Sequence, residues 1–298
     1  MRKIVLLQLL LLLAFLCGGC FHQEKHHIES LEKIYQEIGK FKVLEADKGT
    51  YEWHNEAKER FERLVGRKSK LEIEMYVDYF QPPEETIKKK AGDCEDLAIL
   101  FVSAARYLGF KARVVIGKLK REHQSPYGLF HVWAEIFWRG KWEIVDPTLA
   151  SKIPLDYFFT HPYPVEKVVI TFDENTYQGP QLKELQWEEM KKRKPELQQR
   201  LFLFLVGKFE AEAKRKPTDL EIKEIEEIAS ILADECSRFY LSGVPDDLRK
   251  LIRPQEIKEW IEGVLPPFFL SKTAKLYKVS LYTYLNVLSV FHYYLKAL

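Results

Sequence analysis

The chain is poor in cysteine and carries almost no excess of charge. Four Cys among 298 residues are too few for a small secreted scaffold held together by disulfides. The 46 basic and 44 acidic residues leave a net charge of +2, without the basic surplus that neutralises nucleic-acid phosphates. With 14 Gly and 14 Pro, the chain is neither collagen-like nor of low complexity. Its 46% of apolar residues suffice for a buried core, in one large domain or two modest ones.

Signatures of metal and cofactor sites are also missing. Beyond the first twenty residues there is no Cys-x-x-Cys pair, and nowhere is there a His-Glu-x-x-His helix. No nucleotide or flavin motif is present. We therefore expect a protein that needs neither metal nor cofactor and does not bind nucleic acid.

An apolar run opens the chain. Arg2 and Lys3 precede residues 4–16, which are too short for a finished membrane span and fit the core of a signal peptide. The run ends in Leu-Cys-Gly-Gly-Cys, which resembles a lipoprotein processing site, although Cys17 stands where an aliphatic residue is usual. We expect cleavage after residue 19 and a lipid on Cys20, which would anchor the protein to a membrane outside the cytoplasm. An ordinary secretory signal or an uncleaved anchor are the alternatives.

The remaining chain divides near residue 180, into a domain of residues 20–180 and a helical domain of residues 181–298. Loop signals and apolar spacing predict an N-terminal set of helices followed by strands, which indicates an α+β fold. Residues 95–108 are apolar nearly all round, so this helix should be central and buried. The helices are expected at 28–41, 51–64, 83–90 and 95–108, and the strands at 112–119, 129–138 and 141–145, with 70–79 ambiguous.

The second domain reads as all-helical. Thr218 to Glu221 form a capping box that opens a helix, and the apolar stripe of that helix includes Cys236. This cysteine is therefore expected to be a buried structural thiol. Further helices are expected near 254–264 and from residue 271 to the end, the last as a core helix rather than a membrane span.

Candidate chemistry lies at Cys94, His131 and Asp146. Cys94 falls at the first turn of the buried helix, where unpaired N–H groups and the helix dipole stabilise a thiolate. Asp93 and Asp96 can cap this helix, but their charges oppose a thiolate, so activation requires a cationic partner such as the His131 imidazolium. Each residue also has a plain structural interpretation, since a cysteine at a helix start or an Asp-Pro turn is common.

Strand register connects the other two residues. A hairpin with Arg139-Gly140 at its tip places Asp146 diagonally beside His131 on one face of the sheet. The carboxylate would then orient the ring, with Nδ1 donating to Asp146 and Nε2 left for the thiol, or the reverse if the ring is turned. The apolar side chains of the buried helix should cover part of the same face. These are Leu97, Leu100, Phe101 and Ala104, packed against Trp133, Glu135 and Phe137.

Five sequence blocks resemble the transglutaminase-like superfamily. They are Pro83–Ile87, Gly92–Ala98, Leu108–Arg113, His131–Glu135 and Lys141–Thr148. The resemblance covers about residues 80–150 and implies a papain-like fold. It further implies Cys94 as nucleophile, His131 as general base and Asp146 as the acid that orients the base.

We therefore expect a cysteine peptidase or amide hydrolase that acts on peptides or proteins outside the cytoplasm. The backbone N–H of Cys94 would donate one hydrogen bond to the oxyanion, and Gln81 or Tyr79 would supply a second. Three alternatives stay open: a protein-crosslinking transglutaminase, a non-catalytic lipoprotein that binds peptides or glycans, and a structural lipoprotein whose C-terminal helices mediate assembly.

Overall fold

The computed structural model describes residues 27–44, 47–52, 56–70, 72–77, 79–120 and 130–265. The expected signal peptide, the lipid site at Cys20 and the helix expected beyond residue 271 lie outside these residues. Among the helices that are described, none is long and apolar enough to cross a membrane.

The first part of the chain alternates short strands with helices. A helix covers residues 27–38, as expected. The elements that follow are β1 (Lys42–Val43), β2 (Asp47–Glu52), α2 (Glu56–Val65), β3 (Glu72–Val77), α3 (Pro83–Lys89), β4 (Ala91–Gly92) and α4 (Cys94–Tyr107). The helix expected from residue 51 starts later, because β2 pairs antiparallel with β3. Within the ambiguous stretch 70–79, this pairing makes residues 72–77 a strand.

A five-stranded antiparallel sheet follows, in the order β7-β6-β5-β8-β9. Three of its strands were expected, and Trp138 pairs with Lys141 as the hairpin predicts. The two strands after residue 160 were not expected from the sequence. The bounds are β5 (Ala112–Leu119), β6 (His131–Trp138), β7 (Lys141–Val145), β8 (Val165–Phe172) and β9 (Tyr177–Gln178). The α+β prediction is therefore confirmed.

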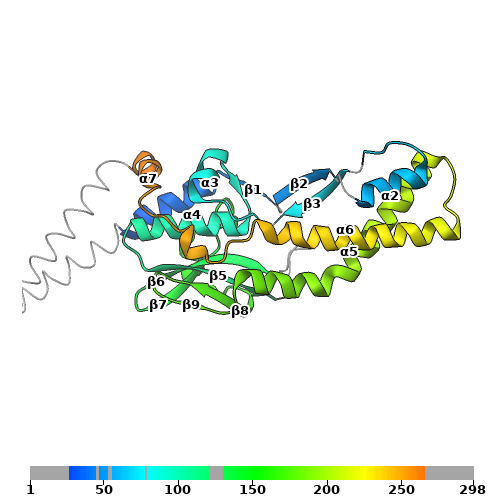
Figure 1. Ribbon diagram of the computed structural model, residues 1–298. Coiled ribbons are helices and arrows are strands. Elements are labelled where there is room, and N and C mark those ends of the chain that lie inside the picture. Colours follow the sequence, from blue (N-terminus) through cyan, green and yellow to red (C-terminus); the bar gives the residue numbers. More distant parts are fainter. Residues whose placement is uncertain are drawn as a thin grey trace, which may run out of the picture.

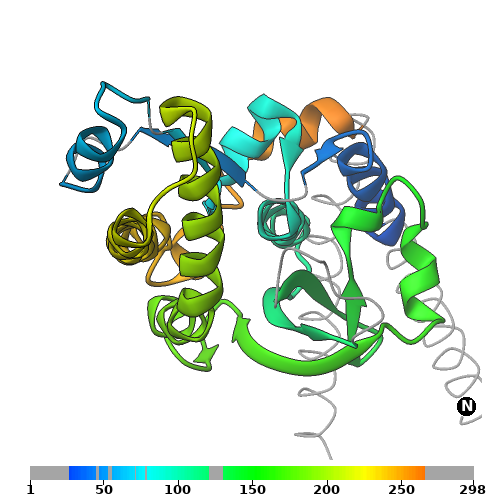
Figure 2. The same ribbon diagram turned by 90° about the vertical axis from the view of Figure 1, so that its right-hand side faces the viewer.

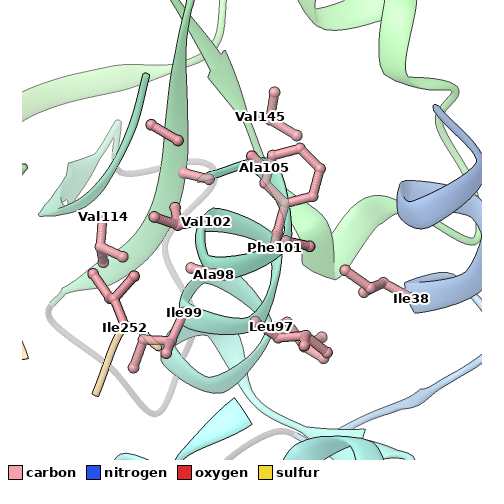
Figure 3. Close-up of a cluster of buried hydrophobic side chains, with 14 of the residues drawn as sticks. Ile38, Leu97, Ala98, Ile99, Phe101, Val102, Ala105, Val114, Val145 and Ile252 are labelled. Carbon is pink, nitrogen blue, oxygen red and sulfur yellow. The ribbon is translucent and has the colours of Figure 1, made fainter. Parts of the chain in front are cut away.

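Helix α4 is the centre of the larger hydrophobic cluster. Every residue from Leu97 to Ala105 is buried, and Figure 2 shows the helix end-on above the sheet. In Figure 3, Val114 of β5, Ile38 of the first helix and Ile252 surround it. A helix that is apolar nearly all round needs cover on most sides, and here the cover comes from elements far apart in the chain.

The expected contact between α4 and one face of β6 is wrong. The cluster around α4 contains the side chains of alternate residues from Val132 to Ile136. Trp133 belongs instead to a separate small cluster, while Phe137 is exposed. Because β6 is apolar at successive positions, its pattern does not distinguish the face that the helix covers.

The second hydrophobic cluster lies among the helices on the right in Figure 1, away from the five-stranded sheet. It joins Ala57 and Phe61 of α2 to helices α5 (Leu182–Ala213) and α6 (Asp219–Ser242). The capping box that was expected at Thr218 is present, with the Thr218 N–H donating to Glu221 Oε2 over 2.8 Å. The long C-terminal helices are thus as expected.

After α6 the chain returns to the larger cluster. Val244, Leu248 and Ile252 pack there, followed by Ile261 of α7 (Lys258–Val264). Both clusters therefore combine residues from before and after residue 180. The division of the chain into domains at that point stays a prediction.

Candidate active site

The first turn of α4 carries the candidate thiol. Cys94 is the first residue of the helix, and Asp93 and Asp96 cap it reciprocally. The Asp93 N–H donates to Asp96 Oδ2 over 3.4 Å. Gly92 is needed just before this turn, because a Cβ at that position would lie 2.6 Å from the Cβ of Asp96. The chain can therefore approach the helix start closely enough to form the cap.

His131 and Asp146 form a direct hydrogen bond. His131 is the first residue of β6 and Asp146 directly follows β7, at adjacent strand ends. The distance from His131 Nε2 to Asp146 Oδ2 is 2.8 Å. The expectation that Nδ1 faces the carboxylate is thus wrong, and the ring is turned as in the stated alternative. Nδ1 is the nitrogen that remains for the thiol.

Cys94 approaches this pair from the helix. Its thiol lies near enough to the His131 ring to raise the pKa of that ring, and it donates a hydrogen bond to Glu95 Oε2 over 3.1 Å. Cys94 is half-buried, and neither it nor Cys236 forms a disulfide within the described residues. The structure therefore brings together Cys94, His131 and Asp146, three residues widely separated in the sequence.

Burial and the pairing act in opposite directions on the two titratable partners. Burial lowers the pKa of His131, but the charge and hydrogen bond of Asp146, together with Cys94, outweigh it and hold that pKa well above its usual 6.5. Burial likewise raises the pKa of Asp146, and His131, Tyr163 and Thr148 outweigh it, so that pKa lies below its usual 3.8. Both directions favour an imidazolium beside a carboxylate.

Asp146 accepts further hydrogen bonds. The Thr148 N–H and hydroxyl donate to Oδ1 over 3.0 and 2.7 Å, and the Tyr163 hydroxyl donates to Oδ2. Tyr35 donates to the backbone oxygen of Asp146 over 3.3 Å. Thr148 could have been inferred from its place two residues after Asp146. No local pattern points to either tyrosine, because each meets Asp146 only through the tertiary fold.

The two candidates for a side-chain oxyanion donor occupy different surroundings. Gln81 is fully buried beside the first turn of α4, where its backbone N–H donates to Asp96 Oδ1 over 2.7 Å and its side-chain amide donates to Oδ2. Tyr79 is 39% exposed, and its hydroxyl donates to Glu85 over 3.0 Å. The contact with Asp96 ties Gln81, but not Tyr79, to the helix that carries the thiol.

Comparison with known proteins identifies the segment that holds these residues. Residues 42–147 match the family model of the transglutaminase-like superfamily. The match includes Cys94, His131 and Asp146 and ends before Tyr163. No curated protein and no solved structure matches the chain. The chain therefore contains a transglutaminase-like domain.

Proposed function

We propose that this protein is a cysteine hydrolase that cleaves amide bonds in peptides or proteins. The observation that carries the proposal is the His131 ring, which donates from Nε2 to a buried carboxylate 2.8 Å away and has the Cys94 thiol near enough to raise its pKa. A thiol, an imidazole and an acid in this arrangement are the parts required for nucleophilic acyl transfer. The transglutaminase-like domain is consistent with this chemistry.

In the proposed reaction the proton of the Cys94 thiol resides on His131 Nδ1, so that the pair starts as a thiolate and an imidazolium. The thiolate attacks the amide carbonyl, and the C–N bond breaks as Nδ1–H protonates the leaving amine. Water then attacks the thioester while Nδ1 takes its proton, and the C–S bond breaks to release the acid and restore the Cys94 thiolate beside the His131 imidazolium. Throughout, Asp146 stabilises the imidazolium and fixes the ring orientation.

The oxyanion needs preorganised donors. The backbone N–H of Cys94 lies in the first turn of α4, where N–H groups have no partner inside the helix. Gln81 is the favoured second donor because Asp96 holds it beside that turn. Gln81→Ala should lower turnover about 10²-fold while Cys94 still reacts with iodoacetamide. Tyr79→Phe is the matched control and should leave both unchanged. Equal effects of the two substitutions would contradict the role of Gln81.

A mixed library of N-terminally blocked peptides tests the activity itself. Hydrolysis creates new termini, or acids from side-chain amides, which mass spectrometry detects. Cys94→Ser should reduce this turnover at least about 10⁴-fold, whereas Cys236→Ser, the same substitution at a remote thiol, should retain it. If the wild type cleaves nothing, or Cys94→Ser cleaves as well as the wild type, the proposal fails and a non-catalytic binding or structural role takes its place.

Amine transfer is the second candidate, and Glu95 favours it. Its carboxylate is 4% exposed and lies 3.1 Å from the sulfur, where it could receive the proton of an incoming alkylammonium group. Repeating the library assay with a labelled primary amine separates the two activities. Amine incorporation that exceeds hydrolysis and is lost in Glu95→Gln would establish crosslinking. Hydrolysis unaffected by added amine would exclude it.

We also propose that Cys20 carries a lipid that holds the protein at a membrane outside the cytoplasm. The basis is the sequence of residues 2–20 alone. Cys20→Ser should move the protein from the membrane to the soluble fraction, whereas Cys17→Leu should leave it on the membrane. A Cys20→Ser variant that remains membrane-bound would contradict the lipid anchor.

A further inference from the structure

The carboxylate of Asp146 accepts more hydrogen bonds than the pairing with His131 requires. Thr148 provides two donors to Oδ1, at 3.0 and 2.7 Å. Oδ2 accepts from two different side chains, His131 Nε2 at 2.8 Å and the Tyr163 hydroxyl. Asp146 is 2% exposed, so these protein donors take the place of water around its charge.

Tyr163 is held in this position by packing. Its ring centroid lies 6.1 Å from that of Trp133 and 6.0 Å from that of Phe158. The ring contacts both the cluster around α4 and the small cluster that contains Trp133. A ring wedged between two clusters has little freedom, so its hydroxyl is directed at Oδ2 by the fold.

The Tyr163 hydroxyl can act only as a donor to the carboxylate. Burial, together with the charge of Asp146, raises the pKa of Tyr163 far above its usual 10, so the phenol stays protonated. The other titratable groups around the carboxylate are His131 of β6, Cys94 of α4 and Tyr35 of the first helix. Neither ring replaces the hydroxyl at Oδ2, because His131 already donates there from Nε2 and Tyr35 donates to the backbone oxygen of Asp146.

We propose that Tyr163 is a positioning residue for the reaction: its hydroxyl fixes the Asp146 carboxylate and so sets the orientation and proton affinity of the His131 ring. The proposal rests on the proposed function and adds a residue outside the segment that matches the family. Two donors that share one oxygen compete for its charge. The hydroxyl therefore weakens the hold of Asp146 on the imidazolium proton, which His131 must give to the leaving amine.

Titration of His131 by NMR in Tyr163→Phe tests this without a substrate. Eight His are present, and the His131 signal is assigned by its loss in His131→Gln. Without the hydroxyl, Oδ2 directs more charge at the ring, so the pKa of His131 should rise by about half to one unit. Turnover should fall about 10-fold, and the alkaline limb of its pH profile should move to higher pH. Tyr157→Phe, an exposed tyrosine in the same stretch of chain, is the control and should titrate as the wild type.

A second variant covers the case in which Tyr163→Phe does not fold. Tyr163→3-fluorotyrosine keeps the ring and makes the hydroxyl a stronger donor, so the pKa of His131 should fall. A His131 titration unchanged in both variants would overturn the proposal, as would an equal shift in Tyr157→Phe. Failure of the proposed function is distinguishable, because it appears as a wild type that cleaves no peptide or as hydrolysis that survives Cys94→Ser, whatever the His131 titration shows.

Discussion

Cys94 and Cys236 both lie on helices packed into hydrophobic clusters, but Cys94 is at the start of its helix and Cys236 is inside its own. Cys236 is in the second half of α6, 1% exposed, and burial raises the pKa of its thiol to about 12. Cys94 is the first residue of α4, half-buried and near enough to the His131 ring to raise the pKa of that ring. The same side chain is thus kept protonated in one place and given a proton acceptor in the other. Position on the helix and the neighbouring charge, not the residue type, decide which thiol can react.

Removing the acid that supports His131 should make Cys94 nearly as unreactive as the buried thiol of Cys236. Asp146→Asn keeps the shape of the side chain but removes the charge that raises the pKa of His131. We expect turnover of the peptide library to fall roughly 10²- to 10⁴-fold. Asp156→Asn, the same substitution at an exposed acid ten residues further along the chain, should leave turnover almost unchanged. Equal turnover in the two variants would show that Asp146 does not support the reaction.

Substitution of Cys94 should affect activity more than substitution of Cys236, but for the free energy of unfolding we expect the opposite order. Cys236→Ser places a hydroxyl inside the cluster of α2, α5 and α6, which should lower the free energy of unfolding by about 1–2 kcal/mol. Cys94→Ser should lower it less, because that side chain is half-buried beside polar partners. Urea unfolding of the two variants measures both values. A larger loss for Cys94→Ser would mean that the thiol at α4 is chiefly structural.

The smallest effect concerns pH. Because the pKa of His131 is raised in the folded state, its contribution to stability is complete below about 6.5 and is lost as pH rises through the folded value. The lowered pKa of Asp146 contributes above its usual 3.8 and is lost as pH falls. The stability difference between wild type and His131→Gln should therefore be about 1 kcal/mol larger near pH 5.5 than near pH 9.5. A stability difference that is the same at the two pH values would count against the pairing.

Local patterns in the sequence predict the elements that carry the site. The apolar surface of residues 97–105 predicts a buried helix, and Arg139-Gly140 predicts the register that places Asp146 near His131. Both are short-range features, since each depends on neighbours within one helix or one hairpin. The turn of this hairpin requires a positive φ at Gly140, +86°, which glycine adopts readily.

Contacts between distant parts of the chain could not be predicted in this way. Strand β8 pairs with β5, about fifty residues earlier, and its alternation is too weak to predict the strand. The turned ring of His131 and the contact from Tyr163 depend on how side chains pack after the sheet has formed. The face of β6 that meets α4 was predicted wrongly, because both faces carry large apolar side chains.

Alkylation of the folded protein by iodoacetamide at pH 7, followed by peptide mapping of each cysteine, tests the central claim most directly. An ordinary thiol has a pKa of about 8.5, and an activated one reacts well below that pH. We predict that Cys94 is alkylated first and that Asp146→Asn slows it. Cys236 should react only after unfolding. A Cys94 that reacts no faster than Cys236, or equally fast in Asp146→Asn, would contradict its role as the nucleophile.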